Sequence, residues 1–314
     1  MKIEGPFMFT TALPCKPEVL GKRYPARIGG IDVELVFPSV PMQETADGQQ
    51  CVKKSNCLLP PDGKRFTIWG EDVDWGCPRQ YPRANSFVKA ILISFDCEDS
   101  DAEASSQKIY SAIEKWEDAL VRYCQLCTKH SFGHPVQHHK NAHQNLKLFS
   151  SNEYMPPQQT IYLQGTLYSE DCFISDEQMV QAIAFAASGK ELLLEYQMLL
   201  SAYEARKKGQ NRQAIVDACS AVEICVVNKI RDYCLQYKIR VEPYLRKHRS
   251  LGDRLHCIAR FDSTFPIKDY DKIIVNPRNK VVHYNSAPPP TINDTNKLLA
   301  AAEQCLNHYR VGYC

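Results

Sequence analysis

The sequence predicts an α+β fold, in which an N-terminal mixed α/β domain (residues 1–172) is followed by a C-terminal all-α helical bundle (residues 173–314). Short apolar runs separated by loops with Pro and Gly are typical of strands, and they fill the first part. Long segments with helical periodicity dominate after Ser175. Because 44% of the 314 residues are hydrophobic, each domain has enough apolar side chains for a core of its own.

The first domain is expected to place one helix on a sheet. Apolar side chains recur at helical spacing through Ile109, Trp116 and Leu120, which predicts a helix over residues 102–128. Strands are expected over residues 7–13, 28–37, 65–69, 87–95 and 160–168. We expect this domain to recognise a trigger, a partner or a feature of RNA.

The second domain is expected to be built on a helical hairpin. Helices are predicted over residues 176–208, 212–237, 251–261, 276–283 and 294–309. The turn at residues 207–211 makes the first two helices antiparallel neighbours. Glu223 falls inside the apolar stripe of the second helix, where a carboxylate needs a partner. Arg278 and Arg212 are the candidate partners, and a structural ion pair without a catalytic role is the alternative.

A short motif at residues 276–283, Asn-Pro-Arg-Asn-Lys-Val-Val-His, places a fixed cation and a titratable imidazole on one helix. Asn276 is a favourable N-cap and Pro277 a favourable first helical residue, so Arg278 and the backbone N–H groups are expected to face one anion. His283 lies at the other end, where the helix dipole favours an imidazolium. Residues five apart differ by about 140° in direction around a helix, so we expect a second chain to complete the site.

Basic residues concentrate in the C-terminal half. Residues 176–314 carry 20 basic and 15 acidic side chains, against 18 and 21 in residues 1–175. The stretch 240–260 holds six Arg or Lys residues and two acidic ones, which favours contact with a phosphate backbone. A solvated helix face has the same composition and is the alternative. The candidate RNA-binding residues are Arg246, Lys247, Arg249, Arg254 and Lys280.

A cluster of Cys and His lies at residues 124–143. Cys124 and Cys127 are followed by His138 or His139 and then by His143, at a spacing close to that of zinc fingers. Thiolate and imidazole ligands suit tetrahedral zinc. The alternative is an exposed His-rich loop, because Cys127 continues the apolar stripe of a helix and the ββα pattern of a zinc finger is missing. Structural zinc is thus a candidate cofactor, and no cofactor is expected for catalysis.

Several enzyme classes find no motif here. The chain has no Walker A run, no His-Glu-x-x-His, no Gly-x-Ser-x-Gly and no dinucleotide-binding glycine pattern. No apolar run reaches 18 residues, and the first residues do not resemble a signal peptide. We therefore expect a cytoplasmic protein without a membrane partner, whose 14 Cys are mostly thiols packed as small apolar side chains.

The C-terminal half resembles the HEPN domains of bacterial RNase toxins, antiphage defence proteins and some CRISPR effectors. The resemblance covers about residues 176–314 and rests on the helical hairpin, the segment 218–223 in its second helix, and the late Arg278, Asn279 and His283. It implies a homodimer that places two motifs in a shared cleft and cuts RNA without a metal. It also implies that His283 acts as general acid or base, that Arg278 stabilises the scissile phosphate, and that Asn279 orients one of them.

The resemblance predicts a metal-independent endoribonuclease of the toxin or antiphage defence type, with RNA as its substrate and Glu223 as a supporting residue. An antitoxin or a phage-derived trigger is a candidate partner. The competing interpretation is a non-catalytic HEPN-like interaction module that binds nucleic acid, a nucleotide or a partner protein.

Overall fold

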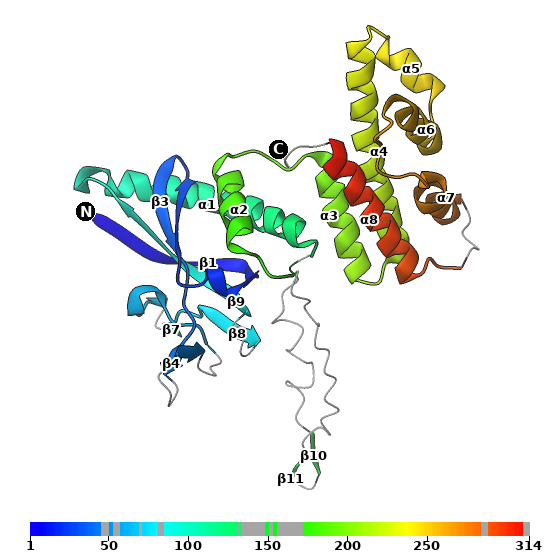
Figure 1. The fold of residues 1–314 in the computed structure, drawn as a ribbon. Coiled ribbons are helices and arrows are strands. Elements are labelled where there is room, and N and C mark those ends of the chain that lie inside the picture. Colours follow the sequence, from blue (N-terminus) through cyan, green and yellow to red (C-terminus); the bar gives the residue numbers. More distant parts are fainter. Residues whose placement is uncertain are drawn as a thin grey trace. The chain divides into compact units, whose positions relative to one another are not determined.

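The computed structural model describes residues 1–44, 50–52, 57–68, 71–80, 85–130, 132, 148–150, 153–155, 172–283 and 288–309. The chain divides into two compact units (Figure 1). The first unit comprises Met1–Thr128 and Phe132–Gly189, and the second comprises Lys129–Ser131 and Lys190–Cys314. An N-terminal antiparallel sheet and a helical C-terminal part agree with the predicted α+β class.

An antiparallel sheet forms the centre of the first unit. Its strands follow the order β1-β9-β3-β2, and β8 also pairs with β9. These strands are β1 (Lys2–Cys15), β2 (Arg23–Ile28), β3 (Ile31–Val36), β8 (Gly76–Gln80) and β9 (Asn85–Asp96). Separate two-stranded pairs are formed by β4 (Met42–Glu44) with β5 (Gln50–Val52), β6 (Thr67–Ile68) with β7 (Glu71–Asp72), and β10 (Leu148–Ser150) with β11 (Glu153–Met155). Single 3₁₀ turns are η1 (Pro17–Val19), η2 (Pro61–Gly63) and η3 (Asp99–Asp101).

Some of the predicted strands are present in the structure and others are not. The runs at 7–13 and 87–95 are confirmed as parts of β1 and β9. The run at 65–69 shrinks to the two residues of β6, and the run at 160–168 lies outside the described residues.

A hairpin of β2 and β3 replaces the single strand that the sequence predicted over residues 28–37. Only Gly29 and Gly30 separate the two strands. Both have positive φ, 60° and 82°, as a type I′ turn requires, and this turn matches the twist of the flanking strands. A Cβ at Gly29 would lie 2.4 Å from the carbonyl oxygen of Lys108 in helix α1 (Ala102–Thr128). Glycine is therefore needed both for the turn and for its close approach to the helix.

Helix α1 confirms the prediction for residues 102–128, and it contacts β1, β2 and β3. Its buried face also carries a carboxylate, Glu117, which is 6% exposed. The Glu117 Oε1 atom accepts hydrogen bonds from the Thr10 N–H (2.5 Å) and the Thr10 hydroxyl (2.8 Å). The pairing of β1 with β9 shifts register between residues 8 and 13, so Glu117 satisfies a backbone donor at an irregular point of the strand.

Helix α2 (Asp176–Ala187) completes the first unit and packs on α1 and β2. The sequence predicted one helix over residues 176–208, and this is wrong, because α2 ends and a separate helix α3 (Leu194–Lys207) follows. Gly189 has a φ of 66°, and its N–H donates to the carbonyl oxygen of Ala186. A glycine in this conformation ends a helix, so the residue predicted inside the helix is its stop signal.

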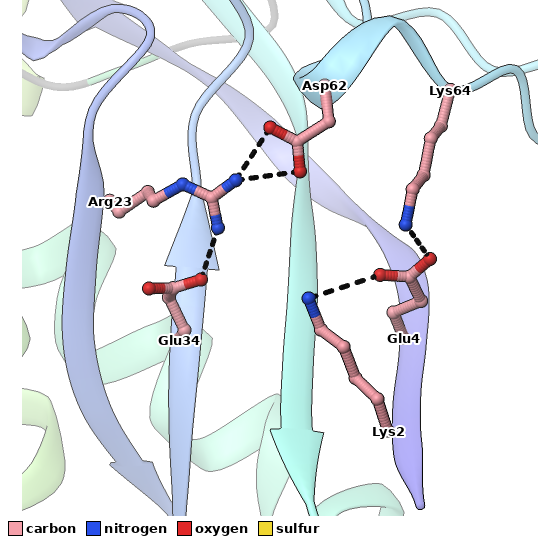
Figure 2. Close-up of polar contacts among 6 residues, drawn as sticks. All are labelled: Lys2, Glu4, Arg23, Glu34, Asp62 and Lys64. Atoms are coloured by element: carbon pink, nitrogen blue, oxygen red, sulfur yellow. Dashed lines mark hydrogen bonds and ion pairs between the residues drawn. The ribbon is translucent and has the colours of Figure 1, made fainter.

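Charged side chains attach the loop around η2 to one face of the sheet (Figure 2). The network consists of Lys2, Glu4, Arg23, Glu34, Asp62 and Lys64. Arg23 donates to both carboxylate oxygens of Asp62, at 2.6 and 2.7 Å, and also contacts Glu34. Glu4 contacts Lys2 and Lys64. Because most of these side chains are exposed, the pairs stabilise the fold weakly and mainly orient the loop.

The second unit is a bundle built around α4 (Asn211–Gln236). The other helices are α3 (Leu194–Lys207), α5 (Val241–Lys247), α6 (Leu251–Phe261), α7 (Asn276–His283) and α8 (Ile292–Tyr309), and the π-helical turn η7 (Asp271–Val275) precedes α7. Helix α4 packs against α3, α5, α6, α7 and α8. The predicted hairpin is confirmed by the close packing of α3 on α4. Ala214, Ala218 and Ala221 are fully buried on α4, and such small side chains allow the neighbouring helices to approach closely.

A helix that spans a bilayer needs about 20 predominantly apolar residues. Among the residues that the structure describes, no helix is long and apolar enough to do so.

Candidate functional site

The helix that carries the motif continues from a wider turn. In η7 the N–H of Asn276 donates to the carbonyl oxygen of Asp271. Pro277 has no N–H, and a π-helical turn before it relieves the clash between its ring and the preceding turn. The prediction that Asn276 caps a free helix end is wrong, because helical backbone already begins upstream. Phosphate contacts at this site are therefore left to side chains.

Arg278 and His283 meet on α7. The Nη1 atom of Arg278 lies 3.4 Å from Nε2 of His283 and 3.3 Å from Oδ1 of Asn279. The prediction that their spacing directs them apart is wrong, because the long Arg side chain reaches along the helix to the imidazole. A guanidinium only donates hydrogen bonds, so this contact is a hydrogen bond when the ring is the neutral tautomer that carries its proton on Nδ1 and accepts at Nε2. Arg278 is half-buried and His283 is exposed, so the motif is assembled within one chain and open to solvent.

Glu223 of α4 forms an ion pair with Arg254 of α6. Their side chains are 34% and 19% exposed, so the pair is partly shielded from water. The Nε atom of Arg254 also donates to the carbonyl oxygen of His248, at 3.1 Å, which ties the segment before α6 to the same pair. The sequence predicted Arg278 or Arg212 as the partner. Instead, the packing of α6 on α4 brings Arg254 to the carboxylate.

Cys219 links the ion pair to the motif. Burial raises the pKa of the Cys219 thiol to about 12, while Arg278 lowers this pKa and Glu223 raises it. Both charged groups therefore lie near the same thiol. The thiol also donates to the carbonyl oxygen of Ile274, at 3.9 Å, and so attaches η7 to α4. A thiol with a raised pKa is a poor nucleophile at neutral pH, so a catalytic role for Cys219 is not expected. Its hydrogen bond to Ile274 instead gives it a structural role, and Glu223 borders the motif through this thiol.

The five candidate RNA-binding residues lie in two environments. Arg246, Lys247, Arg249 and Lys280 are exposed, the first two in the last turn of α5 and the last on α7. The Arg249 Nε atom donates to the carbonyl oxygen of Arg246, at 3.0 Å, which orders the loop after α5. Arg254 differs, because Glu223 neutralises its charge. We expect Arg254 to hold α6 on α4 instead of binding phosphate.

Two of the four candidate zinc ligands, His139 and His143, lie outside the described residues. The other two belong to the end of α1. Burial raises the pKa of the Cys124 thiol well above its ordinary value and that of Cys127 to about 12, which favours packed thiols over thiolate ligands. Among the residues that the structure describes, no group of three or more His, Cys, Asp or Glu side chains is placed to hold a metal ion. The zinc site stays a prediction.

Comparison with known proteins does not assign the chain to a family. No family model matches it, and no match exists among curated proteins or solved structures. The HEPN resemblance therefore rests on the residues of α4 and α7.

The partner of Glu223 has a signal in the sequence that the prediction did not use. In α6, Leu251, Leu255 and Ile258 are buried, and Arg254 falls in the same stripe at three residues from Leu251. A single Arg inside an apolar stripe needs an acceptor, just as a single Glu needs a donor. The apolar stripe of α4 contains Glu223 and that of α6 contains Arg254, so these two opposite charges could have been paired from the sequence.

Proposed function

We propose that this protein is a metal-independent endoribonuclease of the toxin or antiphage defence type. The observation that carries the proposal is the 3.4 Å contact between Arg278 Nη1 and His283 Nε2 on a helix whose imidazole is exposed. Cleavage of a phosphodiester bond needs charge stabilisation at the phosphate and proton transfer at oxygen. A fixed guanidinium next to an imidazole supplies both.

In the proposed reaction, the scissile phosphate replaces His283 as an acceptor for Arg278. A guanidinium binds two phosphate oxygens at once, so this exchange is favourable. As a base, the released Nε2 atom of His283 takes the proton of the ribose 2′-hydroxyl, and water protonates the leaving 5′-oxygen. As the protonated acid, His283 instead gives its proton to the leaving 5′-oxygen, and water takes the proton of the 2′-hydroxyl. The 2′-oxygen attacks phosphorus, and the products are a 2′,3′-cyclic phosphate and a 5′-hydroxyl. Because RNA supplies the nucleophile, the reaction needs no metal-bound water.

Asn279 acts as a positioning residue in this scheme. Its Oδ1 atom accepts from Arg278 Nη1 at 3.3 Å, which limits the rotation of the guanidinium. Glu223 supports the motif indirectly. Its ion pair with Arg254 holds α6 on α4, and α4 also packs on α7. Loss of Asn279 is therefore expected to reduce the rate less than loss of Arg278.

We also propose a homodimer formed through the second unit, with the first unit recognising an antitoxin or a phage-derived trigger. Val282 is 44% exposed and directly precedes His283 in α7. An exposed apolar side chain beside the motif favours an interface there. Because Arg278 reaches His283 within one chain, each subunit of this dimer carries its own pair.

The alternative is a non-catalytic HEPN-like module that binds nucleic acid, a nucleotide or a protein. The exposed cations of α5, Arg246 and Lys247, favour it, because they attract phosphate without any contribution from α7. Both interpretations predict RNA binding. Only the ribonuclease predicts that His283 is needed for an effect on RNA.

Expression in a bacterial host separates the two. We expect the chain to arrest growth and His283→Ala to abolish the arrest at an equal protein level. A matched control is His256→Ala, since His256 is also exposed on the second unit and its ring contacts the Tyr270 hydroxyl, at 3.2 Å, and not a motif residue. This control is expected to remain toxic. Equal toxicity of the chain and its His283→Ala variant would favour the module.

A further inference from the structure

Three aromatic rings form a column at the end of α4. The ring of Tyr233 lies parallel to that of Phe261 in α6, with 3.8 Å between centroids and 3° between planes. On the same face of α4, one turn later, Tyr237 lies 4.5 Å from Tyr233 at an angle of 39°. Tyr237 is the last member of this column and is 57% exposed. The column is supported by α6 at one end and presents a ring to solvent at the other.

The column belongs to a basic segment of the chain. The segment 229–260 runs from the end of α4 through α5 and α6 (Figure 1). It holds nine Lys or Arg residues and three acidic ones. One of the nine, Arg254, is neutralised by Glu223, which lies earlier on α4. The exposed cations are Lys229, Arg231, Lys238, Arg240, Arg246, Lys247, Arg249 and Arg260. Two of them, Lys238 and Arg240, directly follow Tyr237 in the chain.

We propose that Tyr237 and the column beneath it form a stacking platform for an unpaired base of single-stranded RNA, with Lys238 and Arg240 neutralising the adjacent phosphates. An exposed aromatic ring beside cations is how proteins bind single strands without reading their sequence. The rigid column keeps Tyr237 oriented before RNA arrives, so little side-chain entropy is lost on binding. This inference rests on the proposed RNA substrate and assigns it a binding site apart from α7.

A protein partner is the competing occupant, because Leu235 and Ile239 are also exposed near Tyr237. The charge balance favours RNA, since eight exposed cations against three acidic residues match a polyanion better than an ordinary protein surface. The exposed Tyr237 ring can also stack on a base, whereas an aliphatic contact would not need an aromatic ring.

The position of the platform sets a minimum length for RNA. The Cys219 thiol donates to the carbonyl oxygen of Ile274, in the turn that leads into the motif helix α7, and Cys219 precedes Tyr237 by 18 residues, or about 27 Å along the axis of α4. A stacked strand with a rise of about 3.4 Å per nucleotide needs roughly eight nucleotides to cover this distance. Short oligonucleotides should therefore bind at only one of the two places.

The test is binding of fluorescently labelled single-stranded RNA by anisotropy, with His283→Ala in every protein so that the probe stays intact. For a 12-nucleotide RNA, Tyr237→Ala is expected to weaken binding about tenfold, since loss of one stacked base costs about one decade in affinity. Tyr237→Phe keeps the ring and is expected to bind within about twofold. Tyr110→Ala is the matched control, because Tyr110 is 72% exposed on α1 and has no place in the column. It should bind like the parent.

Duplex RNA of the same sequence gives a second comparison, because its bases are already stacked and cannot reach Tyr237. Tyr237→Ala is expected to leave the binding of duplex RNA unchanged. Lys238→Ala and Arg240→Ala should weaken the binding of both the single-stranded and the duplex RNA and reduce the dependence of binding on salt. Unchanged binding of single-stranded RNA by Tyr237→Ala would overturn the platform. A change from dimer to monomer with unchanged RNA binding would overturn it as well and assign the surface to protein.

These results are distinguishable from failure of the ribonuclease proposal. Weaker binding by Tyr237→Ala in a protein that never cuts RNA supports the platform and removes the catalytic proposal. Cleavage that needs His283 but is indifferent to Tyr237→Ala in both binding and KM supports the ribonuclease and removes the platform.

Discussion

Glu223 of α4 and Arg254 of α6 neutralise each other next to the helix that carries Arg278 and His283. This pair determines which arginine is left for a phosphate. Arg254 is committed to a carboxylate, whereas Arg278 donates to the Asn279 amide and to the His283 ring, neither of which carries negative charge. A phosphate therefore competes for Arg278 with weaker partners than it would meet at Arg254.

Removal of one member of this pair should destabilise the second unit more than removal of both. We expect Glu223→Gln to lower the free energy of unfolding by about 1–3 kcal/mol, because Arg254 is left partly buried without a counter-charge. Adding Arg254→Gln should cost less than the two single changes together. Urea unfolding followed by circular dichroism measures each variant.

The matched control for this cycle is an exposed helical pair. Lys208 and Glu204 form an ion pair with side chains 59% and 50% exposed. Glu204→Gln is expected to cost less than about 0.5 kcal/mol. Equal costs for Glu204→Gln and Glu223→Gln would contradict a structural role for the pair with Arg254.

Asp262 should make the stability of the second unit depend on pH. Burial raises its pKa, but hydrogen bonds from Thr264 and His308 outweigh burial and hold the pKa below its usual range. The Thr264 N–H lies 2.8 Å and His308 Nε2 2.9 Å from the carboxylate. A depressed pKa stabilises the fold above the unfolded-state value of 3.8, and this contribution is lost as the pH falls below it.

Asp262→Asn is therefore expected to lower the free energy of unfolding by about 1–3 kcal/mol at pH 7, with the difference from the parent shrinking below the unfolded-state pKa. Unfolding curves at pH 7 and at acidic pH measure this. Asp232→Asn is the control, because Asp232 is exposed on α4. A difference between Asp262→Asn and the parent that grows on acidification would contradict the assigned direction.

Mixing two inactive variants tests whether one chain holds a complete motif. In the structure Arg278 reaches His283 of its own helix. We therefore expect Arg278→Ala and His283→Ala chains to remain inactive when they are unfolded together and refolded as mixed dimers. Recovery of RNA cleavage in the mixture would show that Arg from one chain works with His from the other. Light scattering of the mixture confirms that dimers are present.

The thiols of Cys124 and Cys127 should be protected from alkylation. Burial raises the pKa of both, and Cys124 is fully buried. We expect the exposed Cys57 to react with a thiol reagent before Cys127, and Cys124 only after unfolding, as mass spectrometry of peptides would show. About one zinc per chain in protein prepared without chelators, released as these thiols become reactive, would instead support the predicted zinc site.

Elements with strong periodicity could be predicted from the sequence. Helix α1 was predicted with its observed bounds, because its apolar residues recur over many turns and acidic residues precede it. Helix α6 was also predicted with its observed bounds. The break at Gly189 was missed because apolar residues on both sides continue a helical pattern, and only the backbone shows the positive φ that ends α2. The pair Gly29-Gly30 was a recognisable hairpin signal that the apolar run around it concealed.

The candidate site was predictable in its residues but not in its contacts. The motif identified Arg278 and His283, yet a helical wheel treats side chains as directions and ignores the length of Arg, so it predicted divergence where there is a contact. The partner of Glu223 depends on which helix packs on α4, and periodicity within one helix carries no information on that choice. Nor does the sequence show that η7 continues into α7, because a π-helical turn has no simple residue pattern.

The most direct test of the central claim is cleavage of single-stranded RNA in EDTA by the full chain, with end-group analysis of the products. The account predicts a 2′,3′-cyclic phosphate and a 5′-hydroxyl, no cleavage of DNA of the same sequence, and a loss of rate of about 10²-fold or more in His283→Ala with RNA binding retained. Arg278→Ala should weaken both rate and binding, and His256→Ala should cleave like the parent. Cleavage that depends on Mg²⁺, or that His283→Ala leaves unchanged, would contradict the account.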